Sequence, residues 1–151
     1  MEEVRKYVET VEFLARAFGL AHVTAENRSL YDLTGREYQD RFDRVVFCGV
    51  LYHITDPIVA MRILFNSLKD GGWCWVESTG ARSPQAAFVY ERRSWNWFDP
   101  TPKALKMLME DVGFKDVQVG PVTPDSRVYG VGRREKHVDM RRDGLSVPRL
   151  R

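Results

Sequence analysis

The sequence lacks several features that would assign a protein class at once. Its 151 residues include only two cysteines and three histidines, so neither a disulfide framework nor a spaced zinc motif is present. Charged residues break every apolar run well before the roughly 20 residues that span a bilayer. The first residues also lack the basic and then apolar start of a signal peptide. We therefore expect a cytoplasmic protein with no membrane segment and no metal site.

Strong net charge is absent as well, but the charge is uneven. The chain carries +2 overall, with 44% hydrophobic and 29% charged residues, which is the composition of a globular domain. From Arg133 to the end, seven Lys or Arg face three Asp or Glu. We predict one domain over residues 1–132 and a basic tail over 133–151. A solvated extension is favoured for this tail over an RNA-binding segment.

Hydrophobic spacing predicts the N-terminal elements. An amphipathic helix is expected over residues 3–18, ending at Gly19, because apolar side chains recur at Val4, Val8, Val11, Ala15 and Phe18. His22 to Asn27 is a candidate for a short strand. The polar stretch from Ser29 to Arg41 is expected to be a connection.

A strand–helix–strand unit follows. Phe42 to Cys48 and Trp73 to Glu77 are apolar almost throughout, which predicts neighbouring parallel strands that are covered on both faces. Pro57 begins the helix between them, and Gly71-Gly72 are expected to end it. Cys48 and Cys74 would then be core residues at opposite ends of the sheet, too far apart for a disulfide. A later helix over Lys103–Val112 and two strands over Phe114–Val119 and Arg127–Val131 complete the prediction.

Three segments of this pattern resemble a known family. They are FDRVVFCGVLYHITDP from Phe42, LKDGG from Leu68, and WNWFDPTPKALKMLMEDVGF from Trp95. Together, over about residues 40–131, they resemble the C-terminal half of class I S-adenosylmethionine (SAM) methyltransferases. The most similar branch includes the tRNA wobble-uridine carboxymethyltransferase and small-molecule methyltransferases. The resemblance implies an α/β, Rossmann-like fold with a mostly parallel sheet, an antiparallel last strand, and SAM as cofactor.

The sequence departs from this family at its N-terminal side. The first two strands and their glycine-rich turn are missing, so the fold is expected to be incomplete and the chain N-terminally truncated. The only Gly-x-Gly, Gly130-Val131-Gly132, is interpreted as part of the last strand. Without those two strands, Phe42–Cys48 would be an open apolar edge. We expect His22–Asn27 or another chain, in a homo-oligomer or with a partner, to cover it.

The resemblance also implies site residues. SAM would lie beside Cys48, Gly49 and Leu51, with Asp32 as an off-register substitute for the family's acidic residue. His53 and Glu77 would lie near the reacting atoms. The acceptor would contact four further side chains, Tyr52, Arg93, Trp95 and Trp97, with Arg92 beside them.

Structural alternatives exist for each of these residues. Gly49 would simply make a turn, and Tyr52, His53 and Glu77 would cap loops. The tryptophans would pack over the sheet. For function, the resemblance implies methyl or carboxymethyl transfer to a small molecule or an RNA nucleoside, if another chain completes the site. The alternative is a non-catalytic binding or regulatory module that associates with itself or with a full-length methyltransferase.

Overall fold

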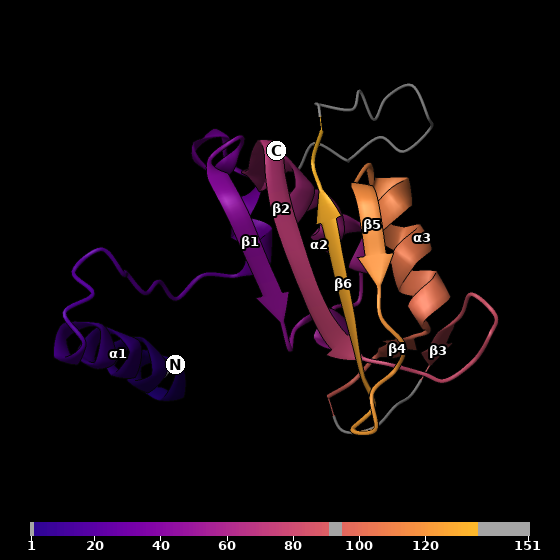
Figure 1. Ribbon diagram of the computed structural model, residues 1–151. Coiled ribbons are helices and arrows are strands. Elements are labelled where there is room, and N and C mark those ends of the chain that lie inside the picture. The colour runs from indigo at the N-terminus through magenta and orange to yellow at the C-terminus, as the bar shows by residue number, and fades with distance from the viewer. Residues whose placement is uncertain (1, 91–94, 136–151) are drawn as a thin grey trace. The chain divides into compact units, whose positions relative to one another are not determined.

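The chain divides into two units, and each is described by itself. The computed structural model describes residues 2–90 and 95–135, with backbone alone for residues 2–5 (Figure 1). One unit is Met1–Asp32 and the other is Leu33–Arg151. The predicted basic tail therefore lies mostly outside the described residues, as do Arg92 and Arg93.

The first unit contains helix α1, Glu2–Ala17, as the apolar spacing predicted. Gly19 ends it in a left-handed conformation with φ +67°, and Leu20 N donates to Ala15 O at 2.8 Å. The strand predicted at His22–Asn27 is wrong. These residues form no ladder and are largely exposed, because a short polar segment does not form a strand without an edge to pair with.

The second unit is built on a mixed sheet with strand order β1-β2-β6-β5 (Figure 1). Strands β1 and β2 are parallel, whereas β6 runs antiparallel to both β2 and β5. The predicted α/β, Rossmann-like fold with an antiparallel last strand is confirmed. Its parallel part is the β1–β2 pair, and the strand bounds are Phe42–Cys48 for β1, Leu68–Thr79 for β2, Lys115–Val119 for β5 and Arg127–Arg133 for β6.

Two helices connect these strands. Helix α2, Pro57–Ser67, crosses from β1 to β2, and α3, Pro102–Val112, leads into β5. Thr101 caps α3 by accepting a hydrogen bond from Ala104 N at 3.2 Å. One boundary differs from the prediction. Gly71-Gly72 do not end α2, because Leu68 already has an extended backbone and pairs with Phe42, so both glycines lie inside β2.

Both helices pack on one face of the sheet. Cys74, Val76 and Val128 are buried beneath them. A Cβ at Gly130 would lie 3.0 Å from Met109 Sδ, so the glycine in β6 lets α3 approach the strand closely. This agrees with the interpretation of Gly130-Val131-Gly132 as part of a strand.

The opposite face differs from the prediction. Phe42–Cys48 was expected to be covered on both sides, yet Val46 is 70% exposed and Cys48 is exposed too. Trp75 and Tyr129 on neighbouring strands are also exposed, and no helix in the described part of the second unit covers them. Cys74 is a core residue, as predicted, but Cys48 is not. Both thiols are free, as expected.

The start of the predicted tail belongs to the domain instead. Arg133 is the last residue of β6, and Arg134 after it is 1% exposed. Its guanidinium donates to Phe65 O and Asn66 O, each at 3.3 Å, and to Leu68 O. Arg134 thereby satisfies carbonyl groups at the C-terminal end of α2. Among the described helices, none has the length and apolar character to cross a membrane.

Two minor strands complete the fold. Strands β3, Phe88–Tyr90, and β4, Phe98–Pro100, follow β2 in the sequence and precede α3. They form a separate antiparallel pair. Short 3-10 helices lie at Leu30–Thr34, Arg36–Tyr38 and Leu51–His53. The last of these follows β1 and the Gly49 turn, and carries three of the predicted site residues, Leu51, Tyr52 and His53.

Candidate functional site

The site lies where three strands meet at one end of the sheet. Parallel strands β1 and β2 end there, and the antiparallel β6 begins there. Glu77 is therefore paired with Cys48 on one side and Tyr129 on the other, while Thr79 is paired with Arg127. Open α/β sheets bind their ligands at the carboxyl ends of parallel strands. We call this end of the sheet the carboxyl rim.

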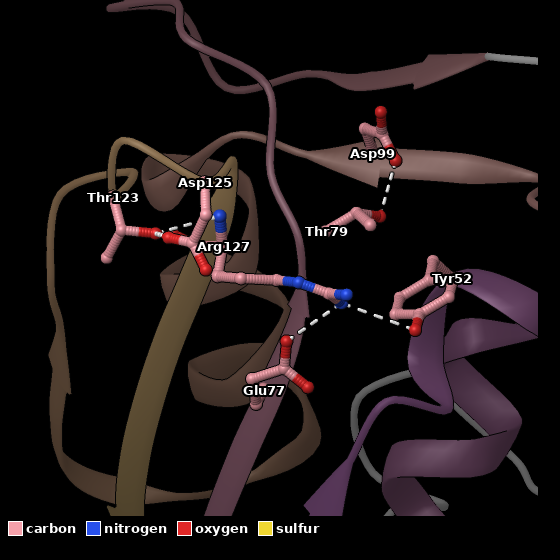
Figure 2. Close-up of polar contacts among 7 residues, drawn as sticks. All are labelled: Tyr52, Glu77, Thr79, Asp99, Thr123, Asp125 and Arg127. Atoms are coloured by element: carbon pink, nitrogen blue, oxygen red, sulfur yellow. Dashed lines mark hydrogen bonds and ion pairs between the residues drawn. The ribbon is translucent and has the colours of Figure 1, made fainter.

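Arg127 is the centre of the polar cluster at the carboxyl rim (Figure 2). Its Nη1 donates to Glu77 Oε1 at 3.0 Å and to Tyr52 Oη at 3.3 Å. Its guanidinium also lies over the Tyr52 ring, 5.5 Å from the centroid. The hydrogen bond to Tyr52, and after it the charge of Glu77, raises the pKa of Arg127, so this residue stays cationic.

A tight turn before β6 holds Arg127 in place (Figure 2). Thr123 Oγ1 donates to Asp125 Oδ1 at 2.6 Å and accepts from Arg127 N at 2.9 Å. The hydrogen bond from Thr123 also lowers the pKa of Asp125. Nearby, Thr79 Oγ1 donates to Asp99 Oδ1 at 2.5 Å, which joins the end of β2 to β4. The polar cluster is thus supported by the turn before β6 and by the contact between β2 and β4.

Gly49 forms the turn between β1 and the 3-10 helix. Its φ is +73°, a left-handed conformation that favours glycine, and its N–H donates to Glu77 O at 3.3 Å. A Cβ there would lie 3.7 Å from Tyr52 Oη and 3.9 Å from Glu77 Oε2, so the turn borders the polar cluster. Leu51 is only 2% exposed and anchors the turn in the core. Gly49 therefore makes the turn, as the structural alternative held, and it also borders the polar cluster.

His53 and the two tryptophans meet on the other side of Tyr52. His53 Nδ1 lies 2.9 Å from Trp95 O, and Trp97 N donates to Tyr52 O at 2.8 Å. Residues 95–97 therefore run alongside residues 52–53. Trp95 is 82% exposed and Trp97 is 40% exposed. Packing over the sheet, the structural alternative, does not account for Trp95.

Of the remaining predicted site residues, Cys48 ends β1 beside Glu77, Asp32 belongs to the other unit, and Arg93 is not among the described residues. Asp32 lies in the first unit, where its Oδ2 accepts from Ser29 N at 3.1 Å. Cys48 is exposed on the uncovered face of the sheet. No cluster of His, Cys, Asp and Glu suited to a metal occurs within the described ranges.

Sequence reasoning missed Arg127, although a signal for it existed. The last strand was predicted to be antiparallel, so its first residue had to lie at the carboxyl rim beside Glu77. Arg127 is that first residue. A cation at this position of a returning strand is the feature that would have identified it.

The residues at the carboxyl rim fit one side of a nucleoside sulfonium. The Gly49 turn leaves half-buried backbone at the end of β1, and the half-buried Tyr52 supplies an aromatic ring next to it, while the Leu51 side chain is buried beneath the turn. The described strands supply no second turn of the glycine-rich kind that cradles the other side of such a ligand.

Comparison with known families decides the kinship. Residues 2–119 match the model of a family described as "Methyltransferase domain". The chain belongs to the class I methyltransferase family. Its resemblance to this family, inferred from three sequence segments, is confirmed.

Individual relatives agree with this kinship. The chain is 30% identical to the tRNA U34 carboxymethyltransferase of Campylobacter hominis over 99 residues, which is 60% of this chain and 35% of that protein. It is 31% identical over 119 residues to the same enzyme of Helicobacter pylori strain Shi470, which is 72% of this chain and 43% of that protein. The chain thus spans less than half the length of these curated relatives.

A solved structure supports the fold. The 1,6-didemethyltoxoflavin-N1-methyltransferase of Burkholderia thailandensis, in complex with 1,6-didemethyltoxoflavin and S-adenosylhomocysteine, matches with a TM-score of 0.64 and 18% identity. The match covers 82% of this chain and 55% of that one. At this identity the match shows the fold alone.

Proposed function

We propose that the carboxyl rim binds SAM or a carboxylated SAM and transfers its methyl or carboxymethyl group to a nucleophile on a small molecule or an RNA nucleoside. The observation that carries this proposal is the Tyr52–Glu77–Arg127 cluster beside the Gly49 turn. A charged cluster of this kind at the ends of parallel strands, in a chain of this family, is suited to holding a ligand rather than to stabilising a core.

In this proposal the residues have distinct roles. When bound, the donor supplies an electrophilic carbon on a sulfonium. Gly49 and the main chain of Leu51 would border the donor, and Tyr52 would position it. His53 would take the proton of the acceptor. Glu77 is already bonded to Arg127, so we assign it the role of positioning that guanidinium instead of accepting a proton.

Arg127 would help to decide between SAM and a carboxylated SAM as the donor. The curated relatives are named carboxymethyltransferases, and a transferable carboxymethyl group would bring an extra carboxylate to the site. A guanidinium has five N–H donors in a fork that suits a carboxylate. Arg127 with Tyr52 would be the partner for that charge.

The donor site would be completed by another chain at the β1 edge. Strand β1 is the outermost strand of its sheet, and Val46 on it is 70% exposed. An apolar edge strand is a template for pairing with another strand. We propose that a partner or a second copy of this chain covers this edge. The same observations favour a second candidate function, a non-catalytic module that associates through β1 without transferring a group.

Calorimetry with S-adenosylhomocysteine tests the first function against the second. We expect measurable heat from the wild-type chain. Arg127→Met should lose more of the heat with a carboxylated SAM, whose extra carboxylate Arg127 would hold, than with S-adenosylhomocysteine, which lacks that carboxylate. Arg133→Met is the matched control, because Arg133 lies at the other end of β6 and pairs with Asp116 at 2.9 Å. Absence of heat at millimolar ligand would overturn the transferase proposal and favour the non-catalytic module.

A further inference from the structure

His53 is held by a hydrogen bond to a main-chain group and by the neighbouring Tyr52 ring, whose centroid lies 4.2 Å from that of the imidazole. The imidazole Nδ1 lies 2.9 Å from the carbonyl oxygen of Trp95, 42 residues further along the chain. A carbonyl oxygen can only accept a hydrogen bond, so this contact requires a proton on Nδ1. In the neutral ring the lone pair then resides on Nε2, and no group within the described residues bonds to it.

The residue that orients His53 also presents a large exposed ring. The Trp95 side chain is 82% exposed, although indole is among the most apolar side chains. Its position is nevertheless defined, because Trp97 N donates to Tyr52 O two residues later. Exposed aromatic rings that neither pack nor hydrogen-bond are well suited to stack on planar ligands.

We propose that Trp95 organises the acceptor side of the carboxyl rim with both its main-chain carbonyl and its indole ring. Its carbonyl fixes His53 in the Nδ1–H tautomer, so that Nε2 receives the acceptor's proton, and its indole stacks on a planar heteroaromatic ring that bears the nucleophile. This inference rests on the proposed function and names its substrate class. Trp95 is a positioning residue for His53 and a binding residue for the ring.

The proton and electron balance of this arrangement is complete. The nucleophilic oxygen or nitrogen of the ring gives its proton to His53 Nε2, and its electron pair forms the new bond to carbon. The carbon–sulfur bond of the donor breaks, and its electron pair stays on sulfur as a neutral thioether. The imidazolium then returns its proton to water.

Nitrogen NMR tests the tautomer without requiring any activity. Long-range 1H–15N correlation spectra of the full chain, recorded above pH 7.5, distinguish Nδ1–H from Nε2–H imidazole, and loss of a signal in His53→Asn assigns it among three histidines. We expect the Nδ1–H form. An Nε2–H form, or rapid exchange between the two, would overturn the inference while leaving donor binding untouched.

Two substitutions of His53 separate its position from its chemistry. The amide of Asn can reproduce the Nδ1–H donor to Trp95 O, but it has no counterpart to Nε2. His53→Asn is therefore expected to keep residues 95–97 in place, seen as unchanged amide shifts, whereas His53→Ala releases them. If amide shifts in this segment are the same in both variants, the hydrogen bond does not hold it, and the inference fails.

Ligand titration tests the stacking surface. The probes are uridine, whose ring is planar, and 5,6-dihydrouridine, which keeps the polar groups but has a puckered ring. Each is used free and within a short single-stranded RNA. Affinity is measured by calorimetry in every variant, and the Trp95 indole N–H is followed by NMR in the variants that retain it. Because stacking on an aromatic side chain is worth roughly 1–3 kcal/mol per base, we expect uridine to bind about tenfold more tightly than dihydrouridine.

Trp95→Ala should abolish this preference, whereas the control Trp75→Leu, which removes an exposed indole from the sheet face, should retain it. A preference seen with free uridine indicates a small-molecule acceptor, and one seen only within RNA indicates an RNA acceptor. Equal binding of both probes, or no change at the Trp95 indole with either form, would overturn the stacking role. Calorimetry with S-adenosylhomocysteine on the same variants shows separately whether the proposed function stands.

Discussion

Two arginines, one at each end of strand β6, differ in what surrounds them. Arg134, just after the end of β6, has a side chain only 2% exposed, with Asp40 at 2.6 Å and carbonyl groups from the end of α2 as further acceptors. Arg127, at the start of β6, has a side chain 34% exposed and donates to Glu77 and Tyr52. Both are charged and multiply bonded. One is enclosed by backbone, whereas the other is open to solvent between side chains.

This difference separates stability from function. The groups around Arg134 include backbone carbonyls that would lose their partner if the side chain were removed, so its role is to hold α2 against the sheet. The partners of Arg127 are polar side chains, and Arg127 itself is 34% exposed, although the side chain of Glu77 is only 12% exposed. A partly exposed guanidinium that is organised by polar side chains at the carboxyl rim is the arrangement expected of a binding site.

The largest effect on stability is expected at Arg134, the buried arginine after the end of β6. Arg134→Met should lower the free energy of unfolding by about 3 kcal/mol, because it leaves buried carbonyl groups unpaired. Urea denaturation followed by circular dichroism measures this value. A loss below about 1 kcal/mol would mean that Arg134 behaves like a surface ion pair, and the contrast between the two ends would disappear.

Cysteine reactivity gives a second, chemical contrast. Cys48 is exposed at the carboxyl rim, whereas burial, with a smaller contribution from Cys48, raises the pKa of the Cys74 thiol to about 12. Iodoacetamide at pH 8 should modify one thiol per folded chain, identified as Cys48 by mass spectrometry. In Arg134→Met, Cys74 should become reactive at a lower urea concentration. Modification of Cys74 in the native wild-type chain would contradict the described core.

A smaller effect on stability is expected at Arg127, the partly exposed arginine at the start of β6. Arg127→Met should change the free energy of unfolding by less than about 1 kcal/mol, because a partly exposed ion pair contributes little. The same urea experiment measures it next to Arg134→Met. A loss as large as that of Arg134→Met would show that the Arg127 cluster is structural, and would remove the main support for a site there.

The smallest effect concerns pH. The hydrogen bond from Thr123 lowers the pKa of Asp125, so its contribution is present above the ordinary aspartate value near 3.9 and is lost as the pH falls further. We expect the amide signals of Thr123 and Arg127 to shift below about pH 4 in NMR titrations. Asp125→Asn should remove that shift. Asp43→Asn, which affects the Lys69 pair at the other end of the sheet, should leave it in place.

The sequence predicted most of the regular structure because the apolar patterns of the helices and strands are strong. Strand β1 was predicted at its observed bounds, and α1 and α3 to within a residue at each end. The segment His22–Asn27 failed because strand propensity has no effect without an edge to pair with. Coverage of β1 on both faces was also wrong, since a run of apolar residues does not reveal what packs on each side.

The site was only partly predictable for a related reason. Gly49, Tyr52, His53 and Glu77 follow strand ends and could be found from local sequence. Arg127 joins them only through the antiparallel return of β6, 50 residues after Glu77 in the sequence. The position of Trp95 rests on the hydrogen bonds that join residues 95–97 to His53 and Tyr52, and sequence periodicity gives no sign of these contacts.

An amide-resolved 1H–15N NMR map of S-adenosylhomocysteine binding tests the central claim most directly, because it compares both ends of the sheet in one experiment. The account predicts shifts concentrated at Gly49, Tyr52, Glu77 and Arg127, with little change around Arg134. Shifts at the Arg134 end, or none anywhere at saturating ligand, would contradict it.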